Sequence, residues 1–119
     1  MRVKLPCGHG SRLVLMLGVL AATVSVSASA VVVNFPDPGL EAAIRDKIGI
    51  PTGDIQDTDL TGVTYLHASD RGISNLDGIQ HCVDLEELYL GYNEIVNISD
   101  LSGLINLEWL YLSDNQIVD

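Results

Sequence analysis

The chain has 119 residues, with 16 acidic against six basic residues and a formal net charge of −10 at pH 7. Residues 31–119 hold all 16 acidic residues but only three of the basic ones, so the charge is concentrated there. Such an acidic surface repels phosphate backbones, which argues against nucleic acid as a partner.

Residues 1–30 have the features of a signal peptide for export. Three basic residues precede or flank the apolar run 13–22, and residues 28–30 are Ala-Ser-Ala. This is an A-x-A cleavage signal, so we expect cleavage after Ala30 and a secreted or cell-surface protein. The run is shorter than the ~20 residues of a comfortable transmembrane helix, and we expect no membrane span after cleavage. An uncleaved membrane anchor is the alternative interpretation.

Residues 31–61 contain one predicted helix. Asp37 followed by Pro38 is typical of a helix start, because Asp accepts bonds from the first turn and Pro needs no donor there. Gly49 ends the helix. One apolar stripe is expected along it, formed by Leu40, Ile44 and Ile48. A short helix with a single apolar face suits a cap that covers the first unit of a larger array.

The loop after this helix, residues 53–60, carries three carboxylates at spacings of three and two. A calcium site is one interpretation, but the loop lacks the Gly and the distal Glu of a calcium-binding loop. We favour a turn that starts at Asp57 or Thr58 and brings Leu60 to the core.

Residues 62–119 repeat with a period of 22 residues, giving about two and a half copies. The central copy is Leu85, Leu88, Leu90, Asn93, Ile95, Ile98, Leu101 and Leu104. Adding 22 to each number gives Leu107, Leu110, Leu112, Asn115 and Ile117. Subtracting 22 gives Val63, Leu66, Ala68, Arg71, Ile73, Leu76, Ile79 and Cys82. A fixed period of this length predicts a solenoid of stacked coils.

The spacing within a copy has a physical meaning. Leu88 and Leu90 alternate with outward residues, which predicts a short strand with one buried face. Asn93 follows where the chain must turn, and an inward Asn can bond backbone groups of neighbouring coils. We therefore expect a structural Asn ladder of Asn93 and Asn115. The later apolar residues recur every third position, which fits 3₁₀ or extended turns.

The pattern LxxLxLxxNxIxxIxxLxxL resembles the leucine-rich repeat, in the 22-residue class of bacterial internalin-type proteins. The resemblance implies an α/β leucine-rich-repeat solenoid, right-handed, with parallel strands on its concave face and a helical N-terminal cap. The first copy departs from the pattern, because Arg71 stands in the Asn position and Ala68 in a Leu position. Such departures are expected of a terminal repeat that contacts a cap.

The third copy ends at Asp119, two residues after Ile117. We therefore expect the array to be incomplete at its C-terminal end, without the polar terminal repeat that solenoids need. We also expect the last strand to leave an unpaired edge, and the chain to self-associate there or to belong to a longer array.

The sequence carries no recognisable catalytic or metal-binding motif. His67 and His81 lack metal-ligand spacing to another donor, and no nucleophile motif or phosphate-binding loop is present. Cys82 occupies an apolar position of the repeat and is expected to be a buried thiol, with a reactive cysteine as the alternative. We expect no enzyme activity, no cofactor and no metal site.

The outward strand residues are the candidate binding residues, because in leucine-rich repeats they line the concave face. They form columns with a spacing of 22: Tyr65, Glu87 and Trp109; His67, Tyr89 and Tyr111; and, just beyond, Asp70, Tyr92 and Asp114. Tyr and Trp dominate protein-binding hot spots. We predict a non-catalytic protein–protein recognition module that binds through Tyr65, His67, Glu87, Tyr89, Tyr92, Trp109 and Tyr111.

Three other interpretations stay open. Aromatic rings with acids nearby also stack on sugars. A carbohydrate-binding surface protein is therefore an alternative interpretation of the same residues. A second alternative is that the chain is the targeting or substrate-recruiting region of a larger secreted enzyme. Finally, the aromatic columns could serve only to stabilise neighbouring strands of a structural spacer, at ~0.2–1 kcal/mol per pair.

Overall fold

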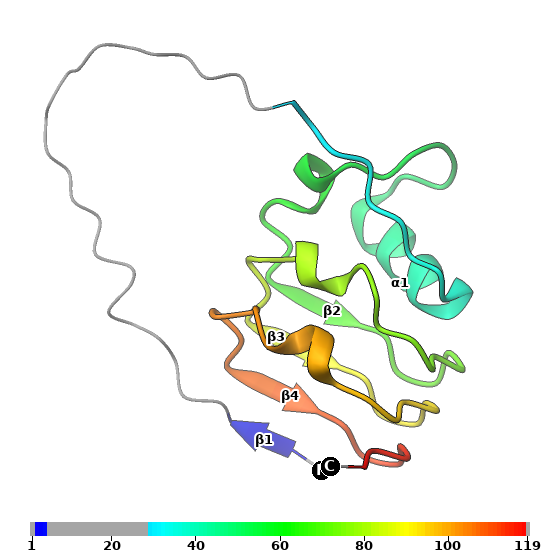
Figure 1. Cartoon of the computed structure of the whole chain (residues 1–119), viewed down its shortest axis with the longest axis vertical. Helices are drawn as coiled ribbons and strands as arrows, with labels where there is room; N and C mark the ends of the chain where they lie inside the picture. Colours follow the sequence, from blue (N-terminus) through cyan, green and yellow to red (C-terminus); the bar gives the residue numbers. More distant parts are fainter. Residues whose placement is uncertain (1, 5–28, 119) are drawn as a thin grey trace, which may run out of the picture.

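The computed structural model describes residues 2–4 and 29–118 (Figure 1). Three 3₁₀ helices, η2 (Asp57–Leu60), η3 (Ile79–His81) and η4 (Ser99–Leu101), lie in the described part. The helix and strands are β1 (Arg2–Lys4), α1 (Pro38–Ile48), β2 (Tyr65–His67), β3 (Glu87–Tyr89) and β4 (Trp109–Tyr111). The apolar run of the expected signal peptide, residues 13–22, lies outside the described residues.

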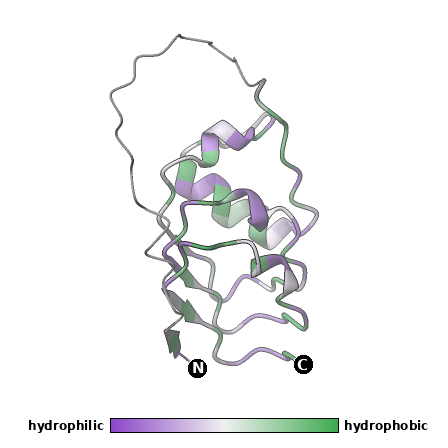
Figure 2. Cartoon of the chain, turned by 60° about the vertical axis from the view of Figure 1, so that its left-hand side comes forward, coloured by the Kyte–Doolittle hydropathy of each residue, from purple (hydrophilic) through white to green (hydrophobic). Residues whose placement is uncertain are grey.

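The period of 22 residues is also the period of the structure. β2, β3 and β4 are parallel neighbours, and Leu66, Leu88 and Leu110 stand opposite one another in the register. Figure 2 shows the strands stacked in one layer, with the turns that connect them on the other side of the molecule. Each coil therefore contributes one strand to the sheet and one returning segment to the opposite side.

The returning segments follow the period-three pattern of the sequence. η3 and η4 overlap in the repeat at one position, where Ile79 is equivalent to Leu101, and the two turns pack against each other. Ile79 and Leu101 point from them into the core, which is continuous from α1 to the last coil. η2 brings Leu60 into the same core, as predicted. Short 3₁₀ turns suit this role because their three-residue repeat keeps every third side chain inward.

Cys82 is fully buried between these coils. Burial raises the pKa of its thiol to about 12, because an apolar environment disfavours the thiolate. The thiol is therefore protonated at neutral pH and packs as a small apolar side chain, as the repeat pattern predicted.

α1 begins and ends where the sequence predicted. One carboxylate oxygen of Asp37 accepts hydrogen bonds from the N–H groups of Gly39 and Leu40, at 2.9 and 3.2 Å. Gly49 ends the helix in the left-handed conformation, with φ of 74°. Leu40 and Ile44 are fully buried and Ile48 is partly buried, so the apolar stripe faces the first coil.

Asp37 also fixes α1 to the first coil. Its second carboxylate oxygen accepts hydrogen bonds from the N–H groups of Ser74 and Asn75, at 2.8 and 3.0 Å. Burial alone would raise the pKa of Asp37, but these bonds and those within α1 outweigh it and lower the pKa below its ordinary value. One ionised side chain thus caps the helix and ties it to a segment 37 residues away.

The outer edge of β4 is paired with β1, contrary to one expectation from the sequence. Arg2–Lys4 pairs antiparallel with β4, and the strand order is β1-β4-β3-β2. Figure 1 shows β1 beside β4 at the C-terminal end of the sheet. The expectation that the last strand leaves an unpaired edge is therefore wrong for the uncleaved chain. The N–H and C=O groups of an edge strand bond any extended segment within reach, and residues 2–4 supply one.

Candidate functional site

The strand register brings the predicted columns together. Tyr65, Glu87 and Trp109 are successive partners across β2, β3 and β4, and so are His67, Tyr89 and Tyr111. The leucines between them are buried, so these six side chains lie on the opposite, solvent-facing side of the sheet. We call this surface the aromatic face: Tyr65, His67, Glu87, Tyr89, Trp109 and Tyr111.

Three rings of the aromatic face form a continuous stack. The ring centroids of His67 and Tyr89 are 4.3 Å apart with planes inclined by 2°. Those of Tyr89 and Tyr111 are 4.4 Å apart with an inclination of 7°. Tyr65 contacts His67 edge-on, at 5.7 Å and 82°. Both faces of the Tyr89 ring are therefore covered, and this residue offers a ligand its edge and its hydroxyl.

Glu87 holds the Tyr89 hydroxyl in place. That hydroxyl donates a hydrogen bond of 2.7 Å to the Glu87 carboxylate. The bond raises the pKa of Tyr89 to about 12, because it stabilises the protonated phenol. Tyr89 is therefore neutral throughout the physiological range, and the carboxylate is oriented along the edge of the stack.

Cations lie over the two outer rings. The Lys47 ammonium nitrogen, from α1, is 3.1 Å from the centroid of the Tyr65 ring. The Arg2 guanidinium carbon, from β1, is 4.0 Å from the Trp109 ring centroid. The negative face of an aromatic ring attracts such cations. Sequence reasoning missed both contacts, because each joins residues that are far apart along the chain.

Tyr92 lies apart from the aromatic face, in the turn after β3. Its φ is 56°, and the equivalent residues Asp70 and Asp114 have φ of 56° and 58°. Asp tolerates this left-handed conformation, whereas a bulky Tyr is strained in it. The Tyr92 side chain is also 65% exposed, so it gains little from packing. Stability alone does not explain a Tyr at this position, which makes it a candidate contact residue.

The side chains of Asn93 and Asn115 form hydrogen bonds with backbone groups of neighbouring coils. The Asn93 side chain is buried; its oxygen accepts from the N–H groups of Arg71 and Ile73, each at 3.0 Å. Its amide nitrogen donates to the carbonyls of Ala68, Leu90 and Gly91. Asn115 bonds its own and the preceding coil in the same way, but is partly exposed.

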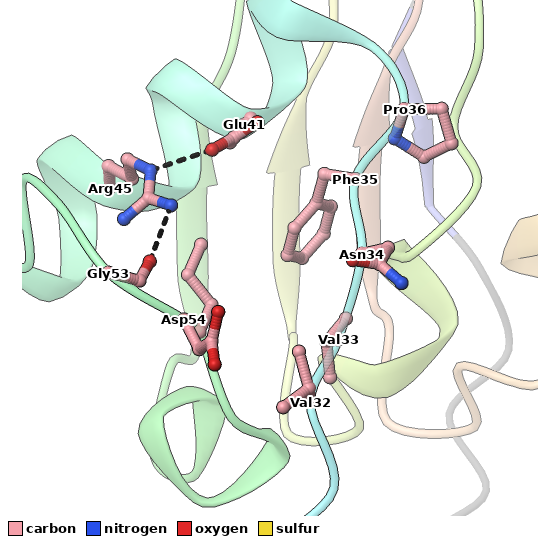
Figure 3. Close-up of a pocket in the computed structure, with 10 residues that line it drawn as sticks. Val32, Val33, Asn34, Phe35, Pro36, Glu41, Arg45, Gly53 and Asp54 are labelled. Atoms are coloured by element: carbon pink, nitrogen blue, oxygen red, sulfur yellow. Dashed lines mark hydrogen bonds and ion pairs between the residues drawn. The ribbon is translucent and has the colours of Figure 1, made fainter.

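A polar pocket of about 240 Å³ lies beside α1 (Figure 3). Arg45 extends into it, but its guanidinium already donates to Glu41 at 2.8 Å and to the carbonyls of Gly53 and Ile50 at 2.8 and 3.0 Å. These bonds fasten the loop after α1 to the helix. The Arg45 guanidinium is thus used within the protein, and we assign it a structural role.

No group of three or more potential metal ligands occurs among the described residues. The described helices include none long and apolar enough to cross a membrane. Four aromatic side chains gather on the aromatic face, on the side of the sheet opposite the buried leucines.

Comparison with known proteins defines the class. The family model of the leucine rich repeat matches residues 61–117, the range that holds β2, β3, β4 and their connections. An internalin (InlF) from Listeria monocytogenes shares 31% identity over 71% of the chain, with a TM-score of 0.68. Internalin C2 of the same organism shares 32% identity over 68%, with a TM-score of 0.66. The chain is an internalin-like leucine-rich repeat protein, as its repeat pattern predicted.

A third similar structure comes from Clostridium perfringens. It holds the CBM51-2 domain in complex with GlcNAc and the INT domains of ZmpB, with 36% identity over 64% of this chain and a TM-score of 0.58. The present chain spans 26% of the InlF chain, 37% of the internalin C2 chain and 16% of the ZmpB chain. No curated protein matches the sequence.

Proposed function

We propose that this chain is a non-catalytic protein-recognition module of an exported or cell-surface protein, and that it binds through the aromatic face together with Tyr92. The observation that carries the proposal is the position of the aromatic residues. Four of the five aromatic residues of the repeats lie on one solvent-facing side of the sheet, and the fifth, Tyr92, is in the turn that follows β3. Tyr and Trp supply large contact areas at low cost in side-chain entropy.

The chemistry of the aromatic face favours a partner with basic side chains. Glu87 places a carboxylate between the Tyr65 and Trp109 rings, and both rings have a cation over them in this structure. The surrounding chain is acidic, which speeds the approach of a positively charged partner. A protein surface with Arg or Lys residues around an apolar centre fits these features.

A carbohydrate ligand is supported less well. Sugars stack on exposed ring faces, whereas the faces of Tyr89 are covered by His67 and Tyr111. The complex with GlcNAc belongs to the ZmpB structure and not to this chain. An array of immobilised glycans tests this alternative directly, since selective retention of the chain would favour sugar over protein. Among the described residues, no feature specifically supports a role as part of a larger secreted enzyme.

The proposal includes the arrangement predicted from the sequence. Residues 1–30 would act as the signal peptide, residues 31–61 as a helical cap and residues 62–119 as coils of a right-handed solenoid. The contacts of Leu40 and Ile44 with the first coil support the role of the cap. Mass spectrometry of the exported protein should find Val31 as its first residue; a retained Met1 would contradict cleavage.

A pair of double variants tests the aromatic face. Purified extracellular protein domains are first screened against the immobilised chain, and each binder is then measured against Tyr89→Ala/Tyr111→Ala. A hot-spot truncation typically costs ≥2 kcal/mol, so we expect the dissociation constant to rise by about thirtyfold or more. Circular dichroism of the variant should match that of the parent.

The matched control removes exposed apolar area elsewhere. Val83 and Ile105 are 54% and 63% exposed, occupy equivalent places in two coils, and lie outside the strands. Val83→Ser/Ile105→Ser should leave the affinity unchanged. Equal affinities for both double variants and the parent would contradict binding through the aromatic face and favour the structural spacer.

A further inference from the structure

A second pocket adjoins the aromatic face where α1 packs against β2. Its volume is about 180 Å³, and it is lined by Tyr65 and His67 of the aromatic face. Asp46 and Lys47, near the end of α1, and Arg71, in the turn after β2, also line it. The pocket is formed entirely by residues 43–71, so it belongs to the cap and the first coil.

The positive charge of residues 31–119 is concentrated at this pocket. These residues include only three lysines and arginines, Arg45, Lys47 and Arg71, against 16 acidic residues. Arg45 is bonded within the protein to Glu41 and to two backbone carbonyls. Lys47 and Arg71 both line the pocket, so an acidic part of the chain presents its two other cations at one place.

The repeat does not explain Arg71. This residue occupies the position of Asn93, whose amide both accepts and donates hydrogen bonds, whereas a guanidinium has no acceptor. Instead, the Nη2 atom of Arg71 pairs with a carboxylate oxygen of Asp46 at 3.0 Å. The Asp46 side chain is 70% exposed, and such a pair contributes little to stability. Stability alone is therefore a weak reason for an arginine at this position.

The charges of the pocket suit a carboxylate. The Lys47 ammonium nitrogen lies 3.1 Å from the centroid of the Tyr65 ring, which attracts the ammonium group but does not neutralise it. At their formal charges, Lys47, Arg71 and Asp46 leave one net positive charge. A carboxylate balances that charge, whereas a phosphate monoester carries about −1.5 to −2 and leaves an excess that the acidic surroundings oppose.

We propose that this pocket is a carboxylate-binding subsite of the aromatic face, and that it takes an Asp or Glu side chain of the protein partner. The inference rests on the proposed function, since Tyr65 and His67 belong to both surfaces. Two N–H groups of the Arg71 guanidinium bond the carboxylate side by side, while the largely exposed Asp46 turns into water. One acidic residue on a partner whose other contacts are basic fixes its orientation along the sheet.

Acetate tests the pocket without any partner. The full 119-residue chain, isotope-labelled, is titrated with acetate and with acetamide, its neutral counterpart, at constant ionic strength, and nuclear magnetic resonance follows the side chains. We expect saturable shifts at Lys47 and Arg71 with acetate only. Arg71→Gln should weaken acetate binding about tenfold, and Arg71→Lys less, because the charge remains. Equal shifts with acetate and acetamide would overturn the proposal.

Asp46 provides a variant with the opposite expected effect. Asp46→Asn removes the carboxylate that competes for Arg71, so acetate should bind about two- to fivefold more tightly. Asp100→Asn, in η4, removes the same charge outside the pocket and is the matched control. It should leave the affinity for acetate unchanged. Equal affinities of the two variants would also overturn the proposal, since acetate would then not compete with Asp46 for Arg71.

A double-mutant cycle identifies the source of the carboxylate. Each binder from the domain screen is measured against Arg71→Gln, and its own acidic residues are replaced one at a time by the corresponding amide. We expect Arg71→Gln to raise the dissociation constant about tenfold. One of the partner's replacements should then cause no further loss in that variant, because both changes remove the same contact.

The two proposals fail by different results. Acetate binding together with full affinity of Arg71→Gln for the partner would assign the pocket to another carboxylate, such as that of an acidic sugar, and would overturn the inference. Unchanged affinity of Tyr89→Ala/Tyr111→Ala would contradict the proposed function instead.

Discussion

At the scale of single residues, the side chain of Asp37 joins α1 to the first coil. Its two carboxylate oxygens accept from four backbone N–H groups, two in α1 and two in the first coil. Asn at the same position would still cap the helix, but its amide cannot accept with both ends. We expect Asp37→Asn to lower the free energy of unfolding by about 1–3 kcal/mol at pH 7.

The pH dependence follows from the lowered pKa of Asp37. A carboxyl whose pKa is lower in the folded than in the unfolded chain stabilises the fold above its unfolded value, about 3.8. That contribution is lost as the pH falls through the folded pKa. Urea unfolding of the parent and of Asp37→Asn should therefore show a gap at pH 7 that narrows below about pH 4. A gap that stays constant as the pH falls well below about 3.8, the unfolded value, would contradict the role of the charge.

Asn93 and Asn115 provide a matched pair of positions. Replacing either residue by leucine leaves backbone groups of two coils without a partner, at a cost of about 1–3 kcal/mol. We expect Asn93→Leu to lower the free energy of unfolding more than Asn115→Leu, because Asn93 is buried between coils and Asn115 is partly exposed. Thermal and urea unfolding of the two variants measure the difference. A neutral or stabilising Asn93→Leu would mean that the hydrogen-bond network of Asn93 contributes nothing net.

At this scale the sequence predicted the inward Asn positions but not the second role of Asp37. The Asn positions follow from their place in a repeat, where neighbours above and below are known from the period. Ser74 and Asn75 become neighbours of Asp37 only when α1 packs on the first coil. No local pattern in the sequence indicates that contact. The stacking of His67 and Tyr89 was foreseen as a possibility, whereas the cations over Tyr65 and Trp109 were not.

At the scale of elements, the contact between α1 and the first coil depends on Gly39. A Cβ atom at this position would meet the backbone carbonyl oxygen of Arg71 and lie 3.1 Å from a side-chain carbon of Ile73. Helix propensity alone predicts that Gly39→Ala stabilises the protein by up to ~1 kcal/mol. We expect the opposite sign, a loss of about 1–3 kcal/mol, because helix and coil must move apart. An increase in melting temperature would show that the interface has room to adjust.

Some elements of the fold could be predicted from nearby residues in the sequence, and others could not. The start and end of α1 follow from Asp37, Pro38 and Gly49, and the short strands follow from alternating leucines. The 3₁₀ turns follow from apolar residues at every third position. The pairing of β1 with β4 could not be foreseen, because it joins strands from opposite ends of the chain and uses backbone groups that every sequence has. The sequence analysis expected this edge to be unpaired, whereas β1 pairs with it.

At the scale of the whole molecule, the stacking of the coils determines the layout of the aromatic face. The outward side chains of β2, β3 and β4 form this surface in a fixed register. The packing of repeats that stabilises the fold thereby also sets the spacing of the rings, because each coil adds one row to the aromatic face.

The central claim is that recognition occurs on the aromatic face, and a footprint of the bound partner tests it most directly. Backbone amide and side-chain signals of the labelled chain are recorded by nuclear magnetic resonance with and without a binder from the domain screen. We expect changes to concentrate at residues 65–70, 87–92 and 109–114, the strands and the turns after them. Changes concentrated at η3 and η4, with the rings of Tyr89 and Tyr111 unaffected, would contradict the claim.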